Sequence, residues 1–261
     1  MDFSTIEVSC EGARGGITLN RPDKLNPLST LTLNELIDAA RFLDSRPEVK
    51  VVTVSGRGRS FCAGADLAAF SGGEGSAPSV DAARDAADAG RLMAEAIEAM
   101  RAVTVVRLHG HCVGGGLVLA AACDLRVAAD DTRFSIPEVD LGIPLAWGGI
   151  PRLVREIGPT MTKELVMTCR SFTASEAHAM GFLNRVVPAA DLDASVEDLV
   201  GQLVGKSRLT LTATKRHVNA VTEGMVGTAR AWNDADSLVT ALRDPESRAV
   251  AATYLNRVRG N

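Results

Sequence analysis

The stretch HCVGGGLVLAAACD, residues 111–124, constrains the fold more than any other part of the chain. Three consecutive glycines, Gly114, Gly115 and Gly116, open an apolar run that otherwise favours a helix. Each glycine inside a helix costs about 1 kcal/mol relative to alanine, so three in a row need a reason. Glycines at such a place permit unusual backbone dihedrals and let a ligand approach the main chain closely. The stretch is therefore a candidate binding site at the start of a helix.

The sequence around this stretch alternates between strand and helix patterns. Strand patterns occur at 7–22, as two strands joined by a glycine-containing turn, and at 49–56, 103–110 and 124–129, and helical spacing occurs at 30–43 and 80–100. A loop containing SIPEVDLGIP follows. From Gly149 onward the pattern is nearly all helical, with one more strand candidate at 183–187 and a capping box between Thr173 and Glu176. This order predicts an α/β core with a helical C-terminal portion.

The composition is that of an ordinary globular protein, with 46% hydrophobic and 23% charged residues in a chain of 261. The net charge of −4 argues against a general affinity for nucleic acid. No apolar run reaches the roughly 18 residues that span a bilayer, and the N-terminal sequence lacks the basic and apolar regions of a secretory signal. Five scattered cysteines without a CxxC favour a reduced setting. We therefore expect a cytoplasmic protein with no nucleic-acid or membrane partner.

Several common catalytic motifs are absent from the sequence. The segment GRGRSF, 56–61, lacks the third glycine of a dinucleotide-binding loop, and neither GxxxxGK[ST] nor GxSxG occurs. The four histidines form no HExxH, and no group of residues has the spacing of zinc ligands. We therefore expect no metal site.

Two glycine-bearing turns remain as the candidate site. They are SFCAGADL, 60–67, and HGHCVGGGLVLAAACD, 109–124, and each follows a strand pattern and leads toward helical sequence. The first N–H groups of a helix have no partner within it, so they are free donors. Two such turns side by side could aim two N–H groups at one oxygen atom, which is the geometry of an oxyanion hole.

These motifs resemble the crotonase superfamily, the enoyl-CoA hydratase/isomerase family. The resemblance runs from ITLNRPDKLNPLS, 17–29, to TATKRHV, 212–218, and includes FCAGADL, HGHCVGGG and GGIPRLVREIG. It implies a crotonase-type spiral of ββα units over residues 1–200, with an acyl-CoA site, and a helical C-terminal trimerisation region over residues 201–261. It also implies an acyl-CoA thioester as the substrate, no cofactor beyond the coenzyme A of that substrate, and a homotrimer or a hexamer built as a dimer of trimers.

The resemblance also implies roles for individual residues. The backbone N–H groups of Ala65 and Gly115 match the family's oxyanion-hole positions, and Glu138 in SIPEVDLG matches a family acid–base glutamate. Lys24 and Leu25 fall near the family's loop that contacts coenzyme A, although Lys24 could equally be a solvated surface residue.

Other positions of the pocket depart from the family pattern. Asp66 and Val118 match positions of the substrate pocket, but Val118 stands where family hydratases usually carry a second glutamate. Ala146 stands where other members place an aspartate. Trp147 replaces a residue that is more often small, and it could line or shorten the acyl pocket or simply pack in the core. Glu138 is therefore expected to be the sole acid–base group.

Three functions follow from this pattern. A double-bond isomerase needs only one base, which takes a proton from one carbon and returns it to another. A hydratase would use Glu138 with further groups that the sequence does not identify. A non-catalytic acyl-CoA-binding protein is the third. We favour isomerisation and expect the glycine- and serine-rich segment at 71–79 to be a mobile surface loop.

Overall fold

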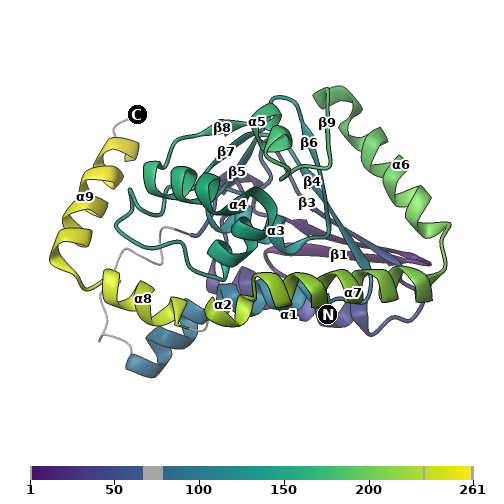
Figure 1. The fold of residues 1–261 in the computed structure, drawn as a ribbon, viewed down its shortest axis with the longest axis horizontal. Helices are drawn as coiled ribbons and strands as arrows, with labels where there is room; N and C mark the ends of the chain where they lie inside the picture. The colour runs from purple at the N-terminus through teal and green to yellow at the C-terminus, as the bar shows by residue number, and fades with distance from the viewer. Residues whose placement is uncertain (1, 67–78, 232, 260–261) are drawn as a thin grey trace.

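The computed structural model describes residues 2–66, 79–231 and 233–259, and a six-stranded sheet forms its centre (Figure 1). In sheet order the strands are β1 (Ile6–Glu11), β2 (Arg14–Leu19), β3 (Val51–Gly56), β4 (Val103–Leu108), β6 (Leu125–Ala129) and β9 (Arg185–Val187). Only β1 and β2 pair antiparallel, and the remaining pairs are parallel. Parallel strands are usually covered on both faces, which explains the nearly continuous β-branched run of β4. All of these strands were predicted.

A second, three-stranded sheet was not predicted. It consists of β5 (His111–Val113), β7 (Arg133–Ser135) and β8 (Phe172–Thr173), in that order. Strands of two or three residues are too short to show an alternating pattern, so sequence reasoning placed β5 at the entrance of a helix and β7 in a loop. This sheet matters because β5 leads directly into the three glycines and β7 leads into the loop with Glu138.

Helices cover both faces of the main sheet. They are α1 (Thr30–Asp44), α2 (Val80–Glu98), α3 (Gly115–Ala122), α4 (Gly149–Thr168), α5 (Ala174–Ala179), α6 (Leu192–Val204), α7 (Arg208–Met225), α8 (Asp234–Ala241) and α9 (Pro245–Arg259). Helix α6 lies on one face, where its apolar residues pack on β3, β4 and β6 (Figure 1). The predicted capping box of α5 is confirmed, since Thr173 and Glu176 each accept a backbone N–H of the other.

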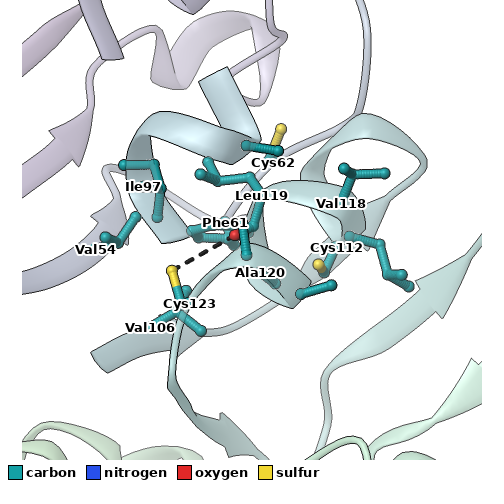
Figure 2. Packing of buried hydrophobic residues seen from close by; sticks show 14 of the residues in the cluster. Val54, Phe61, Cys62, Ile97, Val106, Cys112, Val118, Leu119, Ala120 and Cys123 are labelled. Carbon is teal, nitrogen blue, oxygen red and sulfur yellow. Dashed lines mark hydrogen bonds between the residues drawn. The ribbon is translucent and has the colours of Figure 1, made fainter. Parts of the chain in front are cut away.

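Helix α3 lies inside the main core on the other face. Figure 2 shows Leu119 and Ala120 of α3 near side chains of β3, β4 and α2, including Val54 and Ile97, whereas Val118 lies on the other side of the helix. Every residue of α3 is buried, which explains why this helix carries no charge.

The chain after residue 200 packs back on the core. Lys215 of α7 is buried and donates to Asp124 Oδ2 over 2.7 Å and to the carbonyl of Ala102 over 3.0 Å. Helix α8 packs along α2, and the C-terminal end of α9 lies at the upper left in Figure 1. Within the described residues, no helix combines the length and the apolar character that crossing a membrane requires.

Candidate active site

The two glycine-bearing turns lie side by side. The first turn is tied to the second through Val113 of β5, whose N–H donates to the carbonyl of Cys62 over 3.1 Å. A Cβ atom built on Gly64 would lie 3.0 Å from the Val113 carbonyl and 3.8 Å from the Gly115 nitrogen. Gly64 has a φ of +94°, a backbone conformation that glycine adopts without strain. The segments 60–66 and 109–124, far apart in sequence, therefore meet at Gly64 and Gly115.

The two expected donors have no hydrogen-bond acceptor among the residues that the structure describes. Among the described residues, neither the N–H of Ala65 nor that of Gly115 donates a hydrogen bond, although their neighbours do. Gly114 donates to Ser135 over 2.9 Å and Asp66 donates to Leu28 over 3.0 Å. Gly115 is the first residue of α3, so its N–H also lies at the positive end of the helix dipole.

At each of the three glycines a side chain would collide with a different neighbour. A side chain on Gly114, which has a φ of +47°, would overlap the carboxylate of Glu138. A side chain on Gly115 would overlap the ring of Trp147. A side chain on Gly116 would lie 2.7 Å from the Cβ atom of Cys62. The glycines thus allow a carboxylate, an indole ring and the first turn to approach one helix N-terminus.

Glu138 is a buried carboxyl group with little to stabilise its charge. It is 8% exposed, and its Oε2 atom is buried without a hydrogen-bond partner among the residues that the structure describes. Burial raises the pKa of Glu138 to about 7, because removal from water disfavours the charged form. A carboxyl group with such a pKa can both accept and donate a proton near neutral pH. Strongly perturbed carboxyls of this kind gather at functional sites.

Five of the predicted residues or N–H groups line one small cavity of about 30 Å³. They are Ala65, Gly115, Val118, Glu138 and Trp147, and the other described lining residues are Ile143, Pro144, Leu145, Ala146 and Leu238. Glu138 is the only residue of this lining set with an ionisable side chain. Val118 and Ala146, where the family pattern places further carboxylates, both face this cavity. No group of three or more His, Cys, Asp or Glu side chains that could hold a metal occurs in the described part of the chain.

The remaining predicted residues do not line this cavity. Asp66 lines an adjoining groove of about 380 Å³ and pairs with Arg21 over 2.8 Å. Lys24 is exposed, and Leu25 is half-buried with a φ of +60°. The carbonyl of Leu25 accepts the N–H of Ala63 over 2.8 Å, so this loop is tied to the first turn two residues before Ala65. Residues 71–78 of the predicted mobile loop lie outside the described residues.

Sequence reasoning missed two contributions from α8. Leu238 lines both the cavity and the groove, and Asp234 accepts the N–H of Gly148 over 2.9 Å. Burial raises the pKa of Asp234, and the Gly148 N–H opposes that shift. No local pattern marks either residue, because their roles depend on where α8 docks and not on their neighbours in sequence.

Comparison with known proteins gives a consistent result. Residues 12–258 match the family model described as enoyl-CoA hydratase/isomerase. A crotonyl-CoA hydratase from Syntrophomonas wolfei subsp. wolfei is 34% identical over 86% of this chain and 84% of that protein. A peroxisomal Delta(3,5)-Delta(2,4)-dienoyl-CoA isomerase from Arabidopsis thaliana is 33% identical over 98% of this chain and 96% of that protein. A solved structure of a probable enoyl-CoA hydratase from Mycobacterium smegmatis is 30% identical, with a TM-score of 0.81 and coverage of 91% and 93%.

Proposed function

The chain belongs to the enoyl-CoA hydratase/isomerase family, whose members act on acyl-CoA thioesters, and we propose that it isomerises the double bond of an enoyl-CoA with Glu138 as its only acid–base group. The observation that carries this proposal is the carboxyl group of Glu138, the single one among the described residues that line the cavity, with a pKa near 7.

The substrate carbonyl is activated by main-chain donors. In the proposed complex the thioester oxygen lies between the N–H groups of Ala65 and Gly115, which have no other acceptor among the described residues. When a proton leaves the carbon next to the carbonyl, negative charge develops on this oxygen. Two fixed donors and the N-terminus of α3 stabilise that charge without rearrangement.

The proton transfer needs one group that changes state twice. The Glu138 carboxylate removes a proton from the α carbon of a 3-enoyl-CoA, and the electron pair of that C–H bond delocalises into the thioester as a dienolate. The protonated Glu138 then returns the proton to the γ carbon, which leaves a conjugated 2-enoyl-CoA and the starting carboxylate. A pKa near 7 suits both halves of this cycle.

Hydration is the second candidate, and a relative supports it. The Syntrophomonas protein is named a crotonyl-CoA hydratase. Hydration requires a positioned water and a delivered proton, and a general acid–base group contributes about 10²–10⁴-fold to rate. Val118 and Ala146 offer no such group. We therefore expect hydration to be slower than isomerisation.

The test compares two substrates on the same protein. We expect wild type to convert a 3-enoyl-CoA to the conjugated isomer faster than it hydrates the 2-enoyl-CoA, as followed by the conjugated-enoyl absorbance. Glu138→Gln should lose at least 10²-fold in rate while binding the thioester within about tenfold of wild type. Efficient hydration by wild type would overturn the isomerase assignment. Glu138→Gln activity above a tenth of wild type would show that Glu138 is not the base.

A further inference from the structure

The indole ring of Trp147 forms a wall between the cavity at Glu138 and the larger groove. Ala65, Trp147 and Leu238 are shared by the two linings, so the two spaces adjoin at these three residues. The space on the Glu138 side is about 30 Å³ and that on the other side is about 380 Å³. The position of this one side chain therefore separates a very small space from one more than ten times larger.

The ring is held between two glycines of different helices. A Cβ atom on Gly90 of α2 would overlap the atoms where the two indole rings fuse. A Cβ atom on Gly115 of α3 would overlap the outer edge of the six-membered ring. The ring thus fills the space that side chains at both positions would otherwise occupy. A large side chain placed against main chain on two sides has little freedom to move aside.

The main chain of Trp147 is also held in a strained conformation. Its φ is +63°, which is rare for a bulky residue and costs roughly 1–2 kcal/mol. Arg152 is buried, pairs with Glu98 over 2.5 Å and donates to the carbonyl of Gly148 over 3.1 Å. Asp234 accepts the N–H of the same glycine. Strain of this kind persists only where surrounding contacts enforce it, and it is typical of functional sites.

A thioester extends in two directions from its carbonyl carbon, as an acyl arm and as a sulfur arm. With its oxygen at Ala65 and Gly115, the α carbon must approach Glu138, so the acyl arm enters the 30 Å³ cavity. The sulfur arm points the other way, and in the proposed binding mode it follows the groove, which adjoins the cavity at Ala65, Trp147 and Leu238. A cavity needs about 10–15 Å³ to hold one water-sized group, so the acyl side has room for two or three groups of that size.

We infer that Trp147 is a specificity-determining residue that restricts the substrate to short acyl chains, of about four carbons including the carbonyl. This inference rests on the proposed function in one respect, the placement of the thioester oxygen at Ala65 and Gly115. Longer chains would have to displace a ring that Gly90, Gly115 and the anchored main chain hold in place.

The experiment measures chain-length preference with and without the ring. The substrates are 3-enoyl-CoAs of four, six, eight and ten carbons, and the variants are Trp147→Gly and Trp147→Phe. Glycine suits the positive φ, so Trp147→Gly removes the ring without adding backbone strain. Ile157→Ala is the matched control, because Ile157 packs on the same core and lines neither space.

We expect wild type to lose at least tenfold in kcat/KM between four and eight carbons. Trp147→Gly should gain at least tenfold on the eight-carbon substrate, Trp147→Phe should fall between, and Ile157→Ala should keep the wild-type profile. A flat wild-type profile would overturn the inference, and so would an unchanged profile in a folded Trp147→Gly or Trp147→Phe protein.

A binding measurement separates this inference from the reaction itself. Saturated butyryl-CoA and octanoyl-CoA need no turnover, so calorimetry with them reports the size of the acyl space alone. We expect wild type to bind butyryl-CoA at least tenfold more tightly than octanoyl-CoA, and Trp147→Gly to bind the two equally. That result would support the inference even if the protein isomerises neither chain length. Isomerisation with equal binding of both thioesters would overturn the inference and leave the proposed function intact.

Discussion

Glu138 shows how one buried side chain can define a site. Its carboxyl group lies in an apolar cavity, and a raised pKa is the physical consequence of that burial. Such a group is costly to the fold when it is ionised, because its charge has lost the solvation that water provides. The same cost makes it a base of suitable strength at neutral pH.

The raised pKa predicts a specific dependence of stability on pH. In the unfolded chain Glu138 titrates near its ordinary value of 4.5, whereas in the folded protein it titrates near 7. The folded state therefore holds the proton more tightly, and the stability that this provides below pH 4.5 is lost as pH rises through 7. Since each pKa unit corresponds to about 1.4 kcal/mol, the loss is about 3 kcal/mol.

Glu138→Gln has no such titration, so it isolates the effect. We expect the free energy of unfolding of the variant to rise relative to that of wild type between pH 4.5 and pH 7. Above pH 7 the difference between the two proteins should stay constant. Urea unfolding of both proteins at pH 5 and pH 8 measures the difference. An advantage of equal size at both pH values would show that Glu138 has an ordinary pKa in the folded protein.

At the scale of single elements, α3 is the part on which the site is built. Its N-terminus offers the Gly115 N–H, its glycines admit Glu138 and Trp147, and Val118 in its first turn lines the cavity. The role of the Gly115 N–H can be tested separately from the space around it. Gly115→Pro removes the donor, and proline is well tolerated at the first position of a helix.

Gly115→Ala is the matched control, because alanine meets the same Trp147 ring but keeps the N–H. Loss of one oxyanion donor should lower kcat by about 10²–10³-fold in Gly115→Pro beyond whatever Gly115→Ala loses. Melting temperatures establish that both variants fold. Equal kcat values for the two folded variants would remove the Gly115 N–H from the mechanism.

Val118 provides a second test of α3. Because its side chain lines the cavity with Glu138, Val118→Glu places a second carboxyl group where two could share an attacking water. We expect this variant to gain at least tenfold in hydration of a 2-enoyl-CoA, with lower thermal stability because the new carboxyl is buried. Val118→Gln has a similar size without the carboxyl and should gain nothing. An equal gain in both variants would show that shape, not proton transfer, limits hydration.

The sequence predicted most of this architecture but not how its parts meet. The crotonase-type fold, the strands of the main sheet and the helix behind the three glycines were predicted correctly, since each has a periodic pattern or a motif. The short strands β5 and β7 are too short to show a periodic pattern, so they were not predicted as strands. The Trp147 ring packs between Gly90 of α2 and Gly115 of α3. This contact joins two helices and a loop, so it is seen only in the folded structure.

At the scale of the whole molecule, the site is formed by residues from distant parts of the sequence. Ala65, Glu138 and Leu238 come from the first, middle and last parts of the chain and line one cavity. The helical region after residue 200, expected from the family resemblance to serve trimerisation, thus also contributes to the site of its own chain. Asp234 at the start of α8 makes this contribution through the Gly148 N–H, next to Trp147.

Asp234→Ala therefore tests whether α8 holds the Gly148 turn, and with it Trp147, in place. A hydrogen bond to a charged group contributes about 1.5–3 kcal/mol, and its loss should release the Gly148 turn and let the Trp147 ring move. We expect kcat for a four-carbon substrate to fall about tenfold, and discrimination against eight carbons to weaken, while the melting temperature drops by a few degrees. Asp236→Ala is the matched control on the same helix, because Asp236 forms an exposed pair with Arg84 at 2.9 Å and exposed pairs contribute little. If the two variants lose activity equally, α8 acts on stability alone. If only Asp234→Ala loses both rate and chain-length preference, the site is held from the far end of the chain, through the residue that shapes the acyl cavity.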